Sequence, residues 1–460
     1  MRRIPTLSTL VFVAACTLGP RYERPAIDLP AAWKESAPRF AEDGRWWRIY
    51  SDPALDALLD EALGRNADLL LAVARVDEAR ALLADARGAQ APVVNANGTA
   101  LRQRVSQRSA TFFPGIPNQY TDYRATLNVS WEVDLFGRLR SNVAAARADL
   151  EASAASRDAV RLAVAAEVAK SYFSLRALDE EVDLTRRNVQ LREDALGLQR
   201  KRFSGGVISE FDLRQLEAEA AGVRAQLPPL ERSRDTEEAA LAVLLGRSPR
   251  EIYEGQIVRT SHYEEAPGPP VLPAGIPSEL LLRRPDLVAA ERELAAANAR
   301  IALARADMFP SIALTAFGGR ESAALSNLFS GPAGIWQFAA SITQPIFAGG
   351  RLEARTEAAR ARERQALAQY RKAIQTAFGE VRTALAAEVR SRESYEAESA
   401  RATALGDTLR LARLRYQNGV ASQLDVIDAE RGLLAAQSAR IESLRAYRAA
   451  IADLFRALGG

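Results

Sequence analysis

Side chains that commonly carry enzyme chemistry are scarce in this chain of 460 residues, which has one cysteine, one histidine and two methionines. A catalytic triad or a tetrahedral zinc site needs several such groups together, so this composition argues against hydrolases and metalloenzymes. The single histidine, His262, lies in a proline-rich stretch and is most simply a surface residue. Two methionines give no support to a thioether path for copper. We therefore expect no enzymatic activity, no metal site and no cofactor.

Long apolar runs and a strong charge of one sign are missing as well. No run approaches the roughly 18 apolar residues that a membrane-spanning helix needs. The formal net charge is only +3, so the pI near 9.0 reflects an arginine-rich composition and does not argue for a nucleic-acid partner. Aromatic residues make up 7% of the chain, whereas alanine and arginine are abundant, which suits long helices.

The N-terminus has the pattern of a secretory signal. A short basic region is followed by mostly apolar residues from 7 to 15 and then by Cys16, the one cysteine of the chain. The run Val13-Ala14-Ala15-Cys16 resembles the bacterial lipobox, which predicts a lipoprotein signal peptide at 1–15 and lipidation of Cys16. Thr17 follows where an inner-membrane lipoprotein typically carries Asp, so we expect sorting to the outer membrane. The alternative is a chance cysteine at the end of a plain signal peptide.

The next segment, residues 16–65, contains the first predicted helix. Asp52 is a plausible N-cap, and Pro53 suits the first helical position. Three tryptophans precede this helix: Trp33, Trp46 and Trp47. We expect them to pack the segment onto the body of the protein.

Residues 123–133 alternate strictly between apolar and polar side chains. The odd positions include Leu127, Val129 and Trp131, whereas the even positions are all polar, from Arg124 to Glu132. This period of two predicts a β-strand with one apolar and one polar face. No proline occurs between Leu139 and Phe203, which predicts a helix of roughly 100 Å directly after the strand.

The whole unit occurs twice. Asp68 and Asp286 each begin a helix and are 218 positions apart, as are Pro92 and Pro310, each of which opens a strand. Residues 130–136 match 341–347 at an offset of 211. From Arg138 and its partner Arg351 to the ends of the repeats the offset is 213. Near-constant offsets over such a length predict a tandem duplication.

Each copy reads as helix, strand, strand, very long helix, tight turn and long helix. The predicted strands are 93–105, 123–134, 312–317 and 335–343. Repeat 1 covers 66–250, with strands at about 92–137 and long helices at about 138–245. A proline-rich connector at 251–275 joins it to repeat 2 at 276–460, which has strands at about 310–347 and long helices at about 351–458. Pro228 and Pro229 predict a kink or break in the last helix of repeat 1.

Physical limits narrow the architecture. If the chain crosses a membrane, its strands must do so as a closed barrel, because lipid cannot satisfy an open sheet edge. Four strands cannot close one, since the smallest known barrels have about eight. We therefore expect a fold that is mostly α with membrane β, in which several copies of the chain share one barrel.

Several motifs now carry a resemblance: Asn66-Ala67-Asp68-Leu69, the corner Asp134-Leu135-Phe136-Gly137-Arg138, residues 276–287, Phe309-Pro310-Ser311-Ile312 and Gln344-Pro345-Ile346-Phe347. Over essentially the whole mature chain, the sequence resembles the outer-membrane factor (TolC-type) family. It is especially similar to the lipoprotein branch that serves resistance-nodulation-division efflux pumps.

The resemblance implies a homotrimer in the outer membrane, lipid-anchored and spanning by a shared β-barrel of about twelve strands. It also implies a long periplasmic α-helical barrel and a small mixed equatorial region, onto which residues 16–65 pack. Partners are a periplasmic membrane-fusion adaptor and an inner-membrane resistance-nodulation-division pump. We interpret the protein as a passive export duct for drugs or other small molecules. The alternatives are a periplasmic coiled-coil structural lipoprotein, or a duct for metal efflux or protein secretion.

Two glycine-containing turns join the long helices in pairs and are the predicted periplasmic tips. Glycine and asparagine tolerate the left-handed conformation that ends a helix. The tip residues are Gly205, Gly206 and Val207 in repeat 1 and Asn418, Gly419 and Val420 in repeat 2. Reversal of the chain is their simplest role, and the resemblance adds adaptor docking.

A gate is predicted next to the second tip. Ser209 with Asp212, and Ser422 with Asp425, have capping-box spacing, so each Asp is expected to bond to its own helix start. Asp428 lies one turn beyond Asp425, and its repeat partner is Gln215. In a trimer, three such carboxylates would surround the closed end and favour cations. Candidate partners across the turn are Arg415 and Tyr416; the alternative for Asp428 is a solvated helix residue.

Overall fold

The computed structural model describes residues 19, 22–26, 44–108, 113, 115, 117–259 and 284–460. The predictions for the leader at 1–15, for Cys16, Trp33 and His262 and for the motif residues 276–283 fall outside these described residues. The described chain forms two compact units. The strand unit contains Val76–Ser153, Ala289–Tyr370 and the N-terminal residues up to Ala26; the hairpin unit contains 44–75, Ala154–Val288 and Arg371–Gly460.

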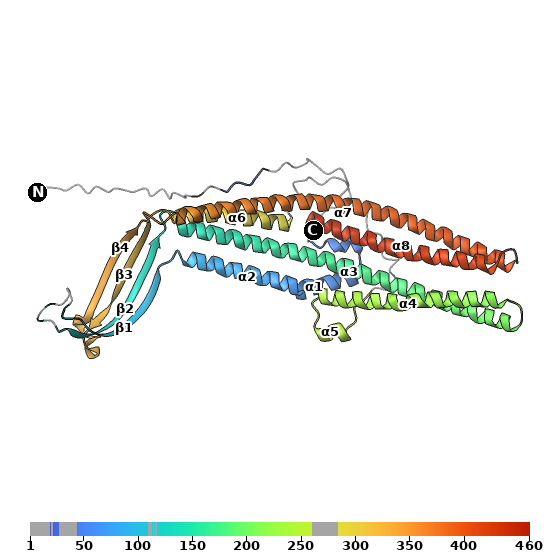
Figure 1. Ribbon diagram of the computed structural model, residues 1–460, viewed down its shortest axis with the longest axis horizontal. Helices are drawn as coiled ribbons and strands as arrows, with labels where there is room; N and C mark the ends of the chain where they lie inside the picture. The colour runs from blue at the N-terminus through green and yellow to red at the C-terminus, as the bar shows by residue number, and fades with distance from the viewer. Residues whose placement is uncertain are drawn as a thin grey trace. The chain divides into compact units, whose positions relative to one another are not determined.

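The strand unit carries one antiparallel sheet of four strands in the order β1-β2-β3-β4 (Figure 1). The strands are β1 (Val93–Arg104), β2 (Gln119–Val133), β3 (Ser311–Ser322) and β4 (Gly334–Thr343). The two repeats meet in the middle of the sheet, where β2 pairs with β3 and Val133 lies opposite Ile312. A single sheet therefore combines both halves of the duplication.

Two strands are longer than the sequence predicts. β2 begins at Gln119 rather than at residue 123, because its first residues pair with Arg104 and its neighbours on β1. β3 extends to Ser322 rather than ending at Phe317, because the start of β2 supplies partners as far as Tyr123 opposite Ser322. A neighbouring strand thus extends pairing beyond the residues whose own pattern is clear.

The helices follow the same repeat. Repeat 1 has α2 (Ala67–Gly88), α3 (Arg138–Ser204) and α4 (Glu210–Leu244), and repeat 2 has α6 (Pro285–Ala306), α7 (Arg351–Gln417) and α8 (Gln423–Leu458). Both α3 and α7 have 67 residues. The shorter elements are η1 (Trp46–Tyr50), α1 (Pro53–Arg65), α5 (Pro249–Glu254), η3 (Leu325–Asn327) and η4 (Gly331–Ala333). No described helix combines the length and apolar character needed to cross a membrane.

Of the predicted kink or break at Pro228 and Pro229, the break is wrong, since α4 continues through both residues. Two ion pairs between α3 and α4 flank the prolines: Arg224 pairs with Glu193, and Arg186 pairs with Glu231 at 2.6 Å. Buried leucines anchor α4 on either side as well. Tertiary contacts on both sides therefore offset the backbone hydrogen bonds that two prolines remove.

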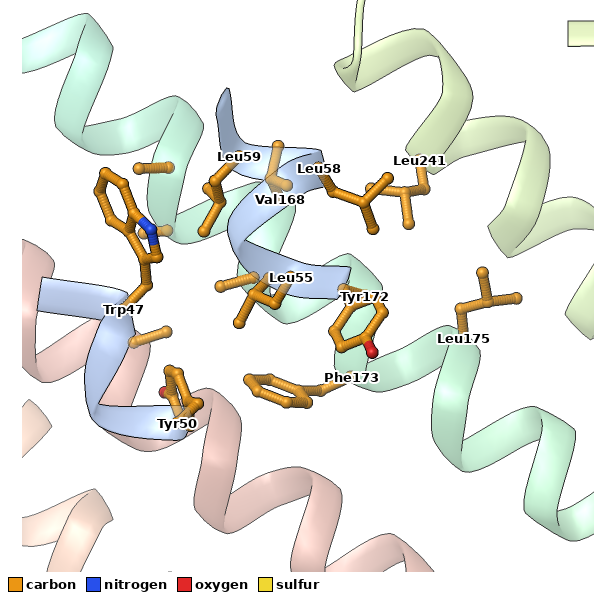
Figure 2. Packing of buried hydrophobic residues seen from close by; sticks show 14 of the residues in the cluster. Trp47, Tyr50, Leu55, Leu58, Leu59, Val168, Tyr172, Phe173, Leu175 and Leu241 are labelled. Atoms are coloured by element: carbon orange, nitrogen blue, oxygen red, sulfur yellow. The ribbon is translucent and has the colours of Figure 1, made fainter. Parts of the chain in front are cut away.

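The main core lies in the hairpin unit, where η1 and α1 pack against α3, α4 and α8 (Figure 2). Trp46 and Trp47 are buried within it, as their predicted packing requires, and Trp46 stacks on Phe455 of α8 at 5.2 Å between ring centroids. Asp52 is the N-cap of α1, as predicted, and its carboxylate also accepts a 2.7 Å hydrogen bond from the buried hydroxyl of Tyr172. The side chain of Asp52 thus caps α1 and also bonds to a residue of the core.

Candidate functional site

The sheet has one apolar face, and that face is exposed. In the register of β2, β3 and β4, Val133, Ile312 and Ile342 lie side by side, and the aromatic residues Trp336 and Phe338 share their face. Trp336, Phe338 and Ile342 are 75%, 77% and 71% exposed. Large apolar side chains rarely cluster on a water-facing surface, so this face indicates contact with lipid or another protein.

The opposite face is polar and internally bonded. Arg124 lies over the ring of Phe317, 4.6 Å from its centroid, and its guanidinium is 3.7 Å from the carboxylate of Glu321. Thr126 on the same face is buried. The alternation that predicted the strand therefore separates an apolar surface from a polar one.

A charged corner connects β2 to α3. The carboxylate of Asp134 accepts hydrogen bonds from the backbone N–H groups of Leu139 and Arg140 at 3.1 and 2.8 Å, which caps the helix. Arg138 donates two hydrogen bonds to Glu132, at 2.8 and 2.6 Å. This fork raises the pKa of Arg138 through its hydrogen bond to Glu132. Sequence alignment of the repeats marks the corner, but the fork becomes visible only in the structure.

The two predicted tips have the same backbone geometry. Gly206 and Gly419 have φ angles of 73° and 74°, a left-handed conformation that glycine adopts without strain. In repeat 1, Val207 N–H bonds to Arg202 C=O, and in repeat 2 Val420 bonds to Arg415 in the same way. Each turn is a Schellman motif. Val207 and Val420 are 63% and 64% exposed, so both tips present an apolar side chain to the surroundings.

Both predicted capping boxes are confirmed. Ser209 and Asp212 bond reciprocally at the start of α4, and Ser422 and Asp425 do so at the start of α8. The backbone N–H of Ser422 is the main cause that lowers the pKa of Asp425, and the charge of Arg415 contributes less. Asp425 therefore acts as a helix cap and lies within the electrostatic reach of one predicted gate residue.

The structure gives the other gate residues different neighbours from those predicted. The carboxylate of Asp428 lies 3.6 Å from the guanidinium of Arg431 on its own helix. The hydroxyl of Tyr416 accepts a 3.2 Å hydrogen bond from Arg202 of α3. Within one chain, Tyr416 therefore joins the end of α7 to the end of α3, while Asp428 pairs within α8.

Sequence reasoning missed a network that joins the two hairpins. The carboxylate of Glu430 in α8 forms one ion pair with Arg192 of α3 at 3.0 Å and another with Arg413 of α7 at 2.9 Å. The side chain of Arg192 is 9% exposed, and its burial lowers its pKa. In repeat 1, the equivalent of Glu430 is Glu217, which pairs with Arg200 within its own hairpin. The 213-residue offset could have revealed the shared pair, but not the additional arginine.

Comparison with known proteins now decides the family. The chain matches the outer membrane efflux protein family over residues 58–247 and 276–460. The chain belongs to this family. It is 35% identical over 463 residues to the toluene efflux pump outer membrane protein TtgC of Pseudomonas putida, covering 98% of this chain and 94% of TtgC. It is 31% identical to the probable outer membrane lipoprotein SilC of Salmonella typhimurium, covering 100% and 98% of the two chains.

The fold agrees with this assignment. The chain matches the crystal structure of the Campylobacter jejuni CmeC outer membrane channel with a TM-score of 0.88 and 25% identity, covering 96% of this chain and 95% of CmeC. The protein is therefore an outer-membrane efflux channel protein. Membership in this family excludes the alternative of a periplasmic structural lipoprotein.

Proposed function

We propose that the chain works as a homotrimer in which each subunit contributes four strands to one barrel of about twelve. The observation that carries this proposal is the open sheet. Within the described residues, β1 and β4 each pair with one neighbouring strand, and the apolar face beside β4 is exposed. A membrane cannot accommodate unpaired strand edges, so copies of the chain must supply the missing partners.

We further propose a passive duct with no chemistry of its own. Repeat 1 at 66–250 and repeat 2 at 276–460, joined by the connector at 251–275, each supply two strands and two long helices to the wall. The duct receives drugs or other small molecules from an inner-membrane resistance-nodulation-division pump through a periplasmic membrane-fusion adaptor. Docking of the adaptor at Gly205–Val207 and Asn418–Val420 is supported by the two matching exposed turns.

The anchor is proposed to be a lipid on Cys16, exposed after removal of the signal peptide at 1–15. The lipobox-like run supports this proposal, and the related SilC is named as a lipoprotein. Lipid on one residue anchors a chain but does not make it span the membrane, so the spanning part of the protein is proposed to be the shared barrel.

The gate is proposed at the closed end near the second tip. Asp428 lies one turn beyond Asp425 at the start of α8, so a trimer would place three Asp428 carboxylates around that end. Arg415 adds a positive charge near Asp425, and Tyr416 ties α7 to α3. Such a ring favours cations until the adaptor separates the tips.

One measurement in neutral detergent tests the assembly. Light scattering of the purified chain should give three chains per particle. On a denaturing gel, the protein should resist heating and keep the mobility of a folded β-barrel. A particle with one chain would refute the shared barrel.

A further inference from the structure

A cavity of about 370 Å³ lies in the strand unit where β2, β3 and β4 approach the starts of α3 and α7. Glu132, Ser311 and Thr343 line it, and all three belong to the polar face of the sheet. A second cavity of about 390 Å³ adjoins it between α3, α6 and α7, and Arg355 and Asp307 line both. Val133, which belongs to the apolar face, also lines the first cavity, so this cavity lies at the end of the sheet and is lined by residues of both faces.

Within the described chain, some charged residues around the first cavity form ion pairs, whereas others form none. Glu132 is held by Arg138, and Asp134 is held by Arg140, at 2.6 and 3.3 Å. Among the residues that the structure describes, no carboxylate forms an ion pair with Arg351 or Arg355. The remaining carboxylate in the lining is Asp307.

The second cavity likewise contains one arginine that forms an ion pair and others that form none within the described chain. Its lining pairs Arg300 with Asp149 at 2.5 Å, but Arg362 forms no ion pair with any carboxylate in the described part of the chain. Arg351, Arg355 and Arg362 share one side of α7, because their spacing of four and seven residues returns to the same helix face. Three arginines and one aspartate along the two cavities therefore form no ion pair with any residue that the structure describes.

The internal duplication shows what an arginine at this position binds. Arg351 is the repeat partner of Arg138, and Thr343 is the repeat partner of Glu132. In repeat 1 the arginine holds a carboxylate through two hydrogen bonds, at 2.8 and 2.6 Å. In repeat 2 the chain offers a hydroxyl in place of that carboxylate. Among the described residues, no carboxylate pairs with Arg351 as Glu132 pairs with Arg138.

Apolar rings complete the site. Phe136 and Phe309 line the first cavity with their ring centroids 5.2 Å apart. Small-molecule sites commonly combine apolar walls with a few placed polar groups, and arginine recognises planar carboxylates in a bidentate manner. The lining therefore matches a molecule with a carboxylate at one end and an aromatic body at the other.

We propose that Arg351 and Arg355, with Thr343 and the Phe136–Phe309 pair, form a binding site for small aromatic carboxylates. Binding itself needs only the described cavity. Its consequence, that organic anions are favoured passengers of the duct, rests on the proposed function and on the further step that the polar face of the sheet lines the channel interior.

Benzoate and its uncharged analogue benzamide are the probes. Binding of each to the full-length protein in an uncharged maltoside detergent is measured by saturation-transfer NMR. Wild type should bind benzoate in preference to benzamide. The double variant Arg351→Gln/Arg355→Gln should bind benzoate about tenfold more weakly, because both charged donors are lost. Arg364→Gln is the matched control, an exposed arginine of α7 outside both cavity linings.

A third variant keeps both arginines. Thr343→Glu recreates in repeat 2 the pair that Glu132 forms in repeat 1, so its own carboxylate should occupy the site and weaken benzoate binding to a similar extent. Equal binding of benzoate and benzamide by wild type would overturn the proposal, and that is the result expected if a neighbouring subunit already neutralises the arginines. Unchanged benzoate binding in either variant would overturn it as well.

Light scattering of the same samples separates this inference from the proposed function. Trimers that ignore benzoate would refute the site alone. Benzoate binding by particles of one chain would refute the shared barrel and leave the site intact.

Discussion

Glu430→Gln is the most informative single change at the hairpin ends. Glu430 connects three helices, because its carboxylate pairs with Arg192 of α3 and Arg413 of α7 while the residue itself belongs to α8. Glutamine keeps the size of the side chain and removes its charge. The variant therefore leaves the guanidinium of Arg192, 9% exposed, without its carboxylate partner.

The size of the effect follows from burial. Breaking a fully buried ion pair by removing one partner costs about 3–5 kcal/mol. Glu430 is 24% exposed and Arg413 is 48% exposed, so solvent screens part of the interaction and we expect about 2 kcal/mol. If opening separates α8 from α3, the closed state alone loses this energy. The ratio of open to closed channels should then rise about 30-fold, since 1.4 kcal/mol corresponds to a factor of ten.

Single-channel recording in planar bilayers measures this ratio as open probability. The matched control is Glu217→Gln, the same change at the repeat-1 position, where the carboxylate pairs with Arg200 and Arg214 inside one hairpin. We expect Glu217→Gln to leave the open probability near that of wild type. Equal behaviour of the two variants would show that the contact between hairpins has no part in closing the channel.

Three further changes test the anchor, the tips and the gate. Cys16→Ser should abolish palmitate labelling while trimers still assemble; label retained on the variant would exclude lipidation of Cys16. Replacing Gly206 and Gly419 with bulky residues should block export without loss of the trimer, because φ angles near 73° strain a bulky side chain, and normal drug resistance would argue against docking at the tips. Asp428→Asn should lower cation preference and, combined with Arg415→Ala, raise resting conductance; unchanged values would make Asp428 a solvated helix residue.

Local features of this protein follow from sequence alone. Period-two alternation at 123–133 located β2 and its two faces, and the Ser-x-x-Asp spacing at Ser209 and Ser422 predicted both capping boxes. Glycine at Gly206 and Gly419 predicted where the long helices turn. These signals are readable because they depend on backbone geometry and on residues within one turn of each other.

Contacts between distant segments were decided only by the tertiary structure. The pairing of β2 with β3 set the true ends of both strands, and flanking contacts kept α4 continuous through Pro228 and Pro229. The duplication predicts which positions of the two repeats are equivalent, but not where their contacts differ. It could not show that Glu430 pairs with a second arginine, or that Arg351 has, in the described part of the chain, no carboxylate like the Glu132 that pairs with Arg138. Local propensity acts along one segment, whereas ion pairs and cavities depend on which faces of separate segments meet in space.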